Sequence, residues 1–506
     1  MTLDSPRVAL REKVARGAFW SLLIQATERV FGLARTVIVA RILAPEDIGL
    51  FALAIVALLI VDTLSKTGIQ SALIYKPGDI ENDLSIAWTV HLFRGAIRGG
   101  ALFVIAPAVA AFFKAPAAAP LIRVVALAFV VEGFTNSGVI YLKKDLALHK
   151  QLLLDVSRLA TDLCVAVAAA FHWRSAAALT YGLVAGYAAQ VWVSYRIHPF
   201  RPRFTFDRRA FGKLMRYGIW MNLYGGVVLI GTHGASLVIG KLIDVRALGL
   251  YQMAHWITQS ALVEVAGAFS VVAFSAYSKM QADAARLRAA FIKMAGFSLG
   301  AALPVAMGIV MVGDVFVHVA LGAKWSGVGP ALQLLALAAL FNAIALSGRP
   351  VFLGLGQPRS LFLMQSLGAV VLLLSIYPFA AAWGVAGAAR AMAVSGLAML
   401  IYWAFRIRRV LALTADDFRQ LFGPAVLGTT TMCAVVALAL PFARPDGAAG
   451  GIAWLIGVSA VAALVYAGTL RLIEPLFPGN RPLDAFAAFF GKSREGDQND
   501  TVPTGR

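Results

Sequence analysis

The chain contains few charged residues for its length. Of its 506 residues, 14% are charged and 60% are hydrophobic, and the mean hydropathy is +0.77. A soluble globular chain carries about a quarter charged residues. Apolar runs of about 20 residues or more recur from end to end, and no polar stretch is long enough for a soluble domain. The composition excludes a soluble protein and predicts an all-α integral membrane protein, because the short alternating segments of a β-barrel are absent.

Cysteines and catalytic motifs are also scarce. Cys164 and Cys433 are the two cysteines, and both fall within apolar segments, which argues against a disulfide and a metal site. The sequence has no Walker A motif, no HExxH and no GxSxG. It therefore predicts no cofactor, no metal and no enzymatic activity.

The apolar segments predict about fourteen transmembrane helices. The expected spans are residues 17–40, 48–73, 85–113, 119–141, 151–171, 176–197, 217–240, 248–274, 295–320, 328–347, 360–381, 383–405, 421–441 and 451–470. Most lysines and arginines fall on one side of this arrangement. The loops of the other side contain Arg41, Lys114, Arg123, Arg174, Lys241, Arg246, Lys324 and Arg444.

This charge asymmetry predicts the orientation. Cytoplasmic loops carry the basic excess, so both termini are expected inside (N-in, C-in). The net charge of +19 then reflects topology and attraction to anionic lipids, and nucleic acid is not an expected partner.

An internal repeat organises the chain. Residues 41–54 (RILAPEDIGLFALA) and 241–254 (KLIDVRALGLYQMA) align at an offset of 200, with Gly49 on Gly249. Six predicted spans separate the two copies, so both cross the membrane in the same direction. Transporters with such parallel repeats bind cargo between two lobes related by an axis along the membrane normal.

The repeat predicts two six-helix lobes related by a pseudo-two-fold axis, followed by two C-terminal helices. The expected divisions are a basic cytoplasmic N-terminus (1–16), an N-lobe with helices one to six (17–198), a basic cytoplasmic linker (199–216), a C-lobe with helices seven to twelve (217–405), helices thirteen and fourteen (406–474) and a polar cytoplasmic tail (475–506).

Basic residues lie inside the first six predicted spans, where a charge is costly unless it is sheltered or paired. Besides Lys66 and Arg158, they are the candidate ligands of an anionic, phosphorylated cargo: Arg29, Arg35, Arg94 and Arg98. Guanidinium groups suit this role because their paired donors match two phosphate oxygens. Arg94 and Arg98 are spaced i,i+4 and repel each other, so the alternative is pairing with acids of neighbouring helices, such as Glu132.

A second set of in-membrane charges consists of candidates for gating or ion coupling: Asp62, Lys66, Glu132, Asp155, Arg158, Asp162, Glu264 and Arg390. Asp62 and Lys66 are spaced i,i+4 and are expected to pair with each other, or to open as a switch during transport. Asp155, Arg158 and Asp162 form a stripe on one helix. This stripe predicts a local salt-bridge ladder, with a proton or sodium relay as the alternative.

Two other groups are expected to be structural. His233 and His255 are lone histidines, for which a packing role is expected. Five aromatics could stack on sugar rings, but aromatic residues at membrane interfaces are common in any case. They are Trp88, Trp220, Tyr224, Tyr251 and Trp256.

Four stretches carry a family resemblance. They are 40–51 (ARILAPEDIGLF), 248–251 (LGLY), 277–281 (YSKMQ) and 383–389 (WGVAGAA). The first resembles the first-loop signature of the Wzx-type polysaccharide flippases in the multidrug/oligosaccharidyl-lipid/polysaccharide exporter superfamily. The second and third resemble the corresponding second-lobe pattern, and the fourth resembles the glycine-alanine start of helix twelve. Members often have a proline within residues 272–275 (VAFS), and this chain has none there.

The resemblance implies export of an undecaprenyl-diphosphate-linked oligosaccharide across the bacterial inner (cytoplasmic) membrane, by alternating access, for O-antigen, capsule or exopolysaccharide biosynthesis. The lipid-linked oligosaccharide and membrane phospholipid are the implied partners, in the neighbourhood of glycosyltransferases and a polysaccharide polymerase.

Two alternatives remain open at this point. The first is a cation-coupled multidrug exporter or a lipid II flippase of the same superfamily. Drug-cation exporters favour acidic cavities, whereas acids and bases are nearly balanced here. The second is a membrane glycosyltransferase or polymerase, for which the predicted outer loops are short.

Overall fold

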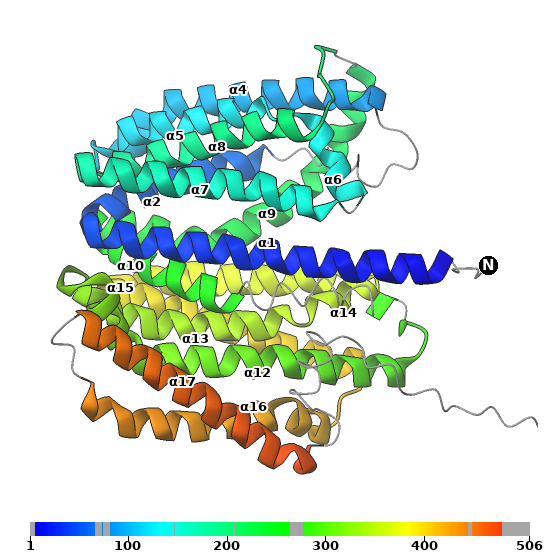
Figure 1. The fold of residues 1–506 in the computed structure, drawn as a ribbon, viewed down its shortest axis with the longest axis vertical. Helices are drawn as coiled ribbons and strands as arrows, with labels where there is room; N and C mark the ends of the chain where they lie inside the picture. Colours follow the sequence, from blue (N-terminus) through cyan, green and yellow to red (C-terminus); the bar gives the residue numbers. More distant parts are fainter. Residues whose placement is uncertain are drawn as a thin grey trace, which may run out of the picture.

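The apolar segments fold into long helices, because within hydrocarbon a helix satisfies every backbone polar group internally. The computed structural model describes residues 6–65, 81–145, 147–205, 208–263, 280–443 and 448–477, together with residues 73, 273, 277 and 278. Most of the helices run nearly side by side along one direction (Figure 1). Two groups of helices can be distinguished, and we call them the first and second bundles.

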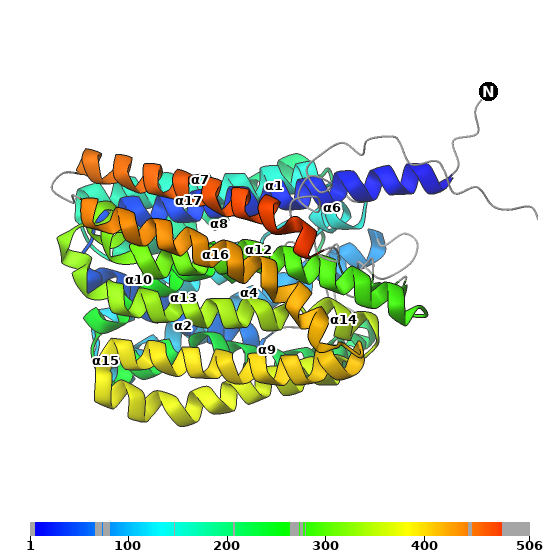
Figure 2. The same cartoon turned by 90° about the horizontal axis from the view of Figure 1, so that it is seen from below.

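The first bundle contains α1 (Pro6–Ile42), α2 (Pro45–Leu64), α4 (Glu81–Phe112), α5 (Ala118–Gly133), α6 (Ile140–Lys144), α7 (Leu148–Trp173) and α8 (Ala177–Ile197). The second bundle contains α9 (Arg208–Leu242), α10 (Val245–Thr258), α12 (Ala284–Phe316), α13 (Gly329–Leu346), α14 (Arg349–Gly354), α15 (Pro358–Val410), α16 (Ala415–Ala439) and α17 (Ala448–Ile473). Figure 2 shows α15 along the face opposite α1 and α17.

The membrane character is confirmed by the helices themselves. Eight of the helical stretches within the described residues are long and apolar enough to cross a membrane. The predicted spans 360–381 and 383–405 correspond to the two arms of α15, which fold back on each other at the non-helical residues Trp383 and Gly384. The Ser395 hydroxyl of one arm donates to the Gly368 carbonyl of the other at 2.7 Å. The chain is therefore a multi-pass all-α membrane protein, while the total of about fourteen spans and the N-in, C-in orientation remain predictions.

The sequence repeat reappears in the helix ends. Helix α1 ends at Ile42 and α9 ends at Leu242, and α2 begins at Pro45 whereas α10 begins at Val245. The Asp244 side chain caps α10 by accepting a hydrogen bond from the Ala247 amide at 2.6 Å. We call the end of the molecule that carries these two turns the repeat end, and the opposite end, which carries residues 198–205, the linker end.

Buried apolar side chains join the two bundles. The largest cluster draws on α1, α2, α4, α5, α7 and α8 as well as α9, α10, α13 and α15, and a second cluster lies within the second bundle. At the linker end, Asn136 is fully buried and donates to the Phe200 carbonyl at 2.8 Å. The Thr205 amide donates to the Thr89 hydroxyl at 3.0 Å. Residues 198–205 are thereby attached to the first bundle.

Candidate functional site

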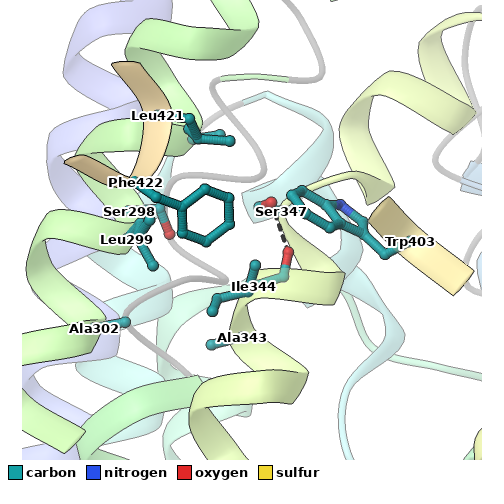
Figure 3. Close-up of a pocket in the computed structure, with 10 residues that line it drawn as sticks. Ser298, Leu299, Ala302, Ala343, Ile344, Ser347, Trp403, Leu421 and Phe422 are labelled. Atoms are coloured by element: carbon teal, nitrogen blue, oxygen red, sulfur yellow. Dashed lines mark hydrogen bonds between the residues drawn. The ribbon is translucent and has the colours of Figure 1, made fainter. Parts of the chain in front are cut away.

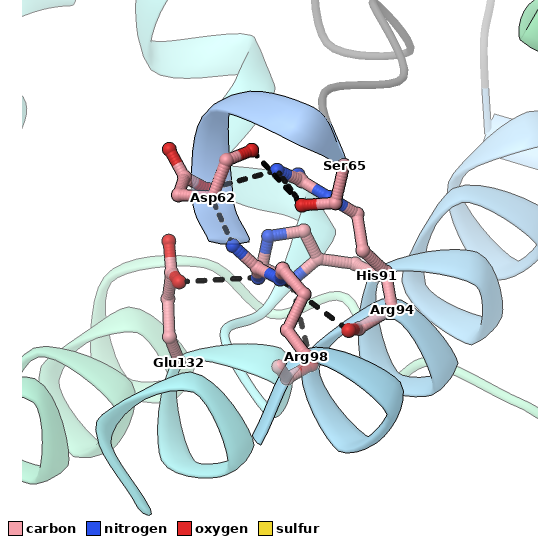
Figure 4. A network of polar contacts seen from close by, with 7 residues as sticks. Asp62, Ser65, His91, Arg94, Arg98 and Glu132 are labelled. Carbon is pink, nitrogen blue, oxygen red and sulfur yellow. Dashed lines mark hydrogen bonds and ion pairs between the residues drawn. The ribbon is translucent and has the colours of Figure 1, made fainter. Parts of the chain in front are cut away.

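Two arginines of α4 converge on carboxylates of two neighbouring helices (Figure 4). Arg94 Nη2 and Arg98 Nη1 lie 2.9 Å and 2.6 Å from the same Oδ1 atom of Asp62 on α2. Arg98 Nη2 also lies 3.3 Å from Glu132 Oε2 on α5. The Arg98 side chain is 3% exposed, whereas Glu132 is 33% exposed. We call these four residues the arginine cluster.

Glycines beside the two arginines explain how α4 comes close enough to α5. In the sequence RGAIRGG, Gly95 and Gly99 each follow an arginine and are spaced i,i+4, so they share one face of the helix. A Cβ atom at Gly95 would stand 2.5 Å from the Phe129 carbonyl oxygen of α5. The glycine face therefore packs on α5, and the Arg98 guanidinium lies over the Phe129 ring at 4.3 Å.

The arginine cluster balances two positive charges with two negative ones. The mutual repulsion of Arg94 and Arg98 is offset by Asp62 and Glu132, the kind of pairing that the sequence offered as the alternative to a diphosphate site. The arrangement differs from the expected Asp62–Lys66 pair, because Asp62 is engaged by α4, and Lys66 lies outside the described residues. The i,i+4 rule considers one helix only and cannot anticipate a partner from another helix.

Arg35 of α1 forms a second buried ion pair. Its Nε atom lies 3.3 Å from Oδ2 of Asp162 on α7, and both side chains are at most one fifth exposed. Small residues of α8 make room for this carboxylate, since a Cβ atom at Gly182 would stand 2.7 Å from Asp162 Oδ1. On its other side, the Arg35 guanidinium lies over the Phe51 ring at 5.3 Å.

The stripe on α7 also finds partners on α1. Arg158 Nη2 lies 4.0 Å from Glu28 Oε1, and Asp162 faces Arg35 as described above. Asp155 accepts hydrogen bonds from the Gln151 amide at 2.9 Å and 3.1 Å. The expected ladder within one helix is therefore replaced, for Arg158 and Asp162, by contacts that tie α7 to α1, because the acids and bases of the two helices face each other.

The remaining predicted residues are scattered. Arg29 is a half-buried residue of α1. Arg390 lies over the Trp383 ring at 4.7 Å in α15 of the second bundle, far along the chain from the arginine cluster. Glu264 lies outside the described residues. The structure thus gathers Asp62, Arg94, Arg98 and Glu132 in one place and gives Arg35 a separate partner.

An interlock at the repeat end was missed at the level of the sequence. Glu46 of α2 and Arg246 of α10 form an ion pair of 2.6 Å, and the two residues are counterparts in the repeat. Gly49 and Gly249 are counterparts as well, and they allow α2 and α10 to touch. A Cβ atom at Gly49 would collide with the Val245 carbonyl oxygen, and one at Gly249 would collide with the Pro45 carbonyl oxygen. The alignment at an offset of 200 pairs Glu46 with Arg246 and Gly49 with Gly249. This pairing was the signal from which the contact could have been predicted.

Basic residues at the ends of α1 and α9 add to this interlock. Arg41 donates to the Val319 and Ala320 carbonyls of the opposite bundle, the latter at 2.6 Å. Its counterpart Lys241 donates to the Phe112 carbonyl at the end of α4, at 2.6 Å. Each bundle therefore caps helix ends of the other, and the two bundles are held together at the repeat end.

A second pair of contacts runs in the same region. Lys324 donates to the Leu43 carbonyl at 2.7 Å, and the buried Trp325 indole donates to the Ala40 carbonyl at 2.9 Å. Both acceptors belong to the end of α1 and the turn that follows it. The turn that carries the first copy of the repeat is consequently bound by side chains of the second bundle.

Two cavities of the second bundle are small. One, of about 10 Å³, is lined by Ser298, Ser347, Trp403 and Phe422 together with apolar residues (Figure 3). The other, of about 40 Å³, is lined by polar and apolar residues of α9, α10, α13 and α15 together with Gln259. A cavity needs about 10–15 Å³ to hold one water, so neither accommodates a sugar or a diphosphate in this conformation.

The sequence also matches known proteins. Residues 38–330 match the family described as "Polysaccharide biosynthesis protein". The chain is 25% identical over 346 residues to the lipopolysaccharide biosynthesis protein WzxC of Escherichia coli, covering 68% of this chain and 70% of that protein. It is 25% identical over 319 residues to the teichuronic acid biosynthesis protein TuaB of Bacillus subtilis, covering 62% and 65%. It is 23% identical over 358 residues to the succinoglycan biosynthesis transport protein ExoT of Rhizobium meliloti, covering 71% and 72%.

Solved structures share the fold. The lipid II flippase MurJ in an inward closed conformation superposes with a TM-score of 0.74 at 13% identity, covering 90% of this chain and 99% of that chain. An inward-facing multidrug resistance transporter of the MATE family superposes with a TM-score of 0.56 at 16% identity, covering 79% and 100%.

Proposed function

The chain belongs to the polysaccharide biosynthesis protein family, and from this premise we propose that it is a transporter that flips an undecaprenyl-diphosphate-linked oligosaccharide across the bacterial inner membrane. The names of its relatives concern lipopolysaccharide, teichuronic acid and succinoglycan, which are all polysaccharides. These names support a polysaccharide precursor as the class of cargo, and the name of ExoT supports transport over enzymatic chemistry. Phospholipid surrounds the protein, and glycosyltransferases and a polymerase would act on the same precursor on either side.

The arginine cluster is the observation that carries the proposal. Arg94 and Arg98 both bind one oxygen of Asp62, so two forked donors already share an anionic oxygen inside the bundle. A diphosphate presents several such oxygens and matches guanidinium forks better than a single carboxylate does. The entering diphosphate would take over Arg94 and Arg98, while Asp62 and Glu132 would turn to water in the opened cavity.

The interlock suggests how the cycle runs. With the N-terminus inside, the repeat end faces outward, so this conformation is closed to the outside. We propose that the lobes 17–198 and 217–405 rock about the linker 199–216, and that the closed repeat end opens once the diphosphate is bound. The residues proposed to contact the diphosphate are Arg29, Arg35, Arg94 and Arg98. The residues proposed for gating or coupling are Asp62, Lys66, Glu132, Asp155, Arg158, Asp162, Glu264 and Arg390.

The test is translocation of undecaprenyl-diphosphate oligosaccharide by purified protein in liposomes. We expect protein-dependent flipping that is lost in Arg94→Ala/Arg98→Ala and partly retained in Arg94→Lys/Arg98→Lys, which keeps the charge and loses the fork. Arg196→Ala is the matched control, because Arg196 stacks on an aromatic ring at 4.8 Å but is exposed and outside the cluster. Each variant is first checked for folding and membrane insertion.

The outcomes separate the competing functions. Flipping that survives Arg94→Ala/Arg98→Ala keeps the flippase and assigns the two arginines to structure. Flipping of lipid II in preference to other lipid-linked glycans would identify a peptidoglycan precursor as the cargo. Antiport of small cations with no flipping of any lipid-linked glycan would contradict the proposal in favour of a drug exporter.

A further inference from the structure

Two histidines meet in the interior of the second bundle. The rings of His233 on α9 and His255 on α10 are 6.2 Å apart and nearly perpendicular. His255 also stacks on Tyr251, with ring centroids 5.9 Å apart. His255 is 6% exposed and Tyr251 is fully buried. Ring stacking agrees with the packing role that the sequence predicts, but it leaves the ring nitrogens to be explained.

Buried polar atoms without hydrogen-bond partners occur at this pair of histidines and beside it. Among the described residues, neither His233 Nδ1 nor Asn342 Oδ1 has a hydrogen-bond partner, although both atoms are buried. His255 and Asn342 line the cavity of about 40 Å³, together with Thr232, Thr258 and Gln259. A cavity of this size has room for about two or three waters, which is what buried polar groups of this kind require. The cavity therefore gathers five polar residues beside the apolar residues of its wall, such as Leu335 and Met392.

The backbone beneath the cavity is also irregular. Helix α10 ends at Thr258 and continues as a π-helical stretch, Gln259–Val263. Such stretches are rare and occur often at functional sites, because they leave backbone groups outside the regular ladder. Gln259 is both the first residue of this stretch and part of the cavity wall.

The site is linked to the contact between the bundles. Trp256 follows His255 and packs edge-on against Phe51 of α2 at 6.2 Å, and Phe51 lies beneath the Arg35 guanidinium. The same helix, α10, carries Gly249 and Arg246 of the interlock. A change at His255 therefore acts on the helix that closes the repeat end.

The chemistry of the site suits a proton better than a metal ion. No acidic residue lines the cavity, and no group of three or more His, Cys, Asp or Glu side chains able to hold a metal occurs in the described part of the chain. The titratable groups that face His255 are His233 from α9 and Tyr251 on its own helix. The adjoining stretches of α2, α13 and α15 present Phe51, Asn342 and Met392, which do not titrate. Histidine is the side chain that exchanges a proton near neutral pH.

We infer that His255 and His233 form a proton-binding site whose occupancy controls closure of the repeat end. When neutral, the two rings pack as observed and the repeat end is closed. A bound proton places one positive charge between the rings, which then requires the Asn342 oxygen and cavity water as acceptors and disfavours the dry contact of α10 with α2. Proton binding therefore opens the repeat end. The role of this opening in a transport cycle rests on the proposed function.

The test needs no lipid-linked cargo, so its failure is distinct from failure of the proposed function. Cys164 and Cys433 are replaced by Ser, and spin labels are attached through cysteines at Ala117 and Ser326, two exposed positions at the repeat end of the two bundles. Distances between the labels are measured on the full chain in lipid nanodiscs from about pH 4 to pH 8, a range that extends below the ordinary titration range of histidine because burial disfavours the charged ring. We expect a longer-distance population that grows as the pH falls, and that is lost in His255→Asn and in His233→Asn/His255→Asn.

Control variants make the result specific. His172→Asn removes an exposed histidine at the repeat end and should leave the pH response unchanged. His255→Gln is measured as a second variant in case His255→Asn does not fold. A pH response that persists in both His255 variants and in the double variant would overturn the inference. Distances that respond to sodium at constant pH, and not to pH, would overturn it in favour of a metal cation.

Discussion

Glu46 and Arg246 are 200 positions apart in the chain, are each other's counterparts in the repeat, and form an ion pair of 2.6 Å. Two residues related by a two-fold axis meet only if they lie close to that axis, so this pair is what the predicted pseudo-two-fold axis would give if it passed between α2 and α10. In a true dimer identical charges would face each other there. In this chain the two counterparts instead carry opposite charges, so they attract each other.

Reversing one of these charges is expected to open the repeat end. In Arg246→Glu, two carboxylates would face each other at the axis. Both side chains are about half exposed, so we expect a shift of only about 1 kcal/mol, roughly fivefold in the closed-to-open ratio. Distances between spin labels at Ala117 and Ser326 measure this ratio.

The charge swap supplies the control. Glu46→Arg/Arg246→Glu restores opposite charges and should restore the closed population, whereas Arg123→Glu changes an exposed charge outside the interlock and should have no effect. If the swap behaves like Arg246→Glu alone, the ion pair is not what holds the two helices.

Glycine at positions 49 and 249 is expected to be indispensable for this closure. Either Gly49→Ala or Gly249→Ala brings a methyl group against a backbone carbonyl of the opposite helix, which has no flexible end to move away. Overpacking of this kind costs about 1–3 kcal/mol, and it acts on the closed state alone. We expect a lower thermal unfolding temperature in the closed conformation and a longer label distance at the repeat end.

A glycine with free space around it provides the comparison. Gly100 lies inside α4, and a Cβ atom there would meet nothing within 4 Å. Gly100→Ala should therefore be neutral or stabilising by up to about 1 kcal/mol, as expected for an unhindered helix interior. Equal destabilisation by Gly100→Ala and Gly49→Ala would show that crowding is not the cause.

Asp62 is expected to matter more for stability than Glu132. Asp62→Asn leaves two guanidinium groups with one carboxylate, whereas Glu132→Gln leaves both arginines bound to Asp62. Loss of one partner of a fully buried pair costs about 3–5 kcal/mol. Since Asp62 is 29% exposed, we expect a smaller loss of about 1–3 kcal/mol for Asp62→Asn and less for Glu132→Gln.

Thermal unfolding of the purified variants measures this difference. Arg94→Gln in the Asp62→Asn background should recover part of the loss, because it removes the charge that Asp62 no longer neutralises. If Glu132→Gln is as destabilising as Asp62→Asn, the shared Asp62 oxygen is not the centre of the arginine cluster.

The sequence was enough to predict the helices around the two repeat turns, but not most of the side chains that pair with the in-membrane charges. Hydrophobic runs and the alignment of 41–54 with 241–254 predicted, to within about three residues, where α1 and α9 end and where α2 and α10 begin, because these helix ends depend on local residues such as Pro45 and Asp244. The starts of α1 and α9, at Pro6 and Arg208, lie well before the predicted starts at 17 and 217, because both helices extend into polar sequence. The partners of Asp62 depend on which face α4 turns toward α2. Gly95 and Gly99 set that face by packing on α5. The spacing of residues within α2 carries no information about the orientation of α4.

The α7 stripe shows the same limit from another side. Asp155, Arg158 and Asp162 satisfy the spacing rule for pairs within a helix, and that rule holds for a helix in water. Inside the bundle, Glu28 of α1 pairs with Arg158, and Arg35 of α1 pairs with Asp162. In-membrane charges are therefore better predicted as sets shared between helices than as pairs along one helix.

The non-helical turn within α15 leads to a last prediction, which concerns the backbone conformation of Gly384. Gly384 has φ of 55° and ψ of −132°, a combination that is open to glycine and strained for other residues. A Cβ atom at Gly384 would meet nothing within 4 Å, so crowding plays no part. We expect Gly384→Ala to destabilise the protein by about 1–3 kcal/mol, the usual cost of one such strained residue, because alanine is strained in the turn that folds the two arms of α15 back on each other. Gly468→Ala is the matched control, since Gly468 is equally free of neighbours and has no positive φ. Thermal unfolding should separate the two variants, and equal stability would mean that the break in α15 does not depend on the glycine.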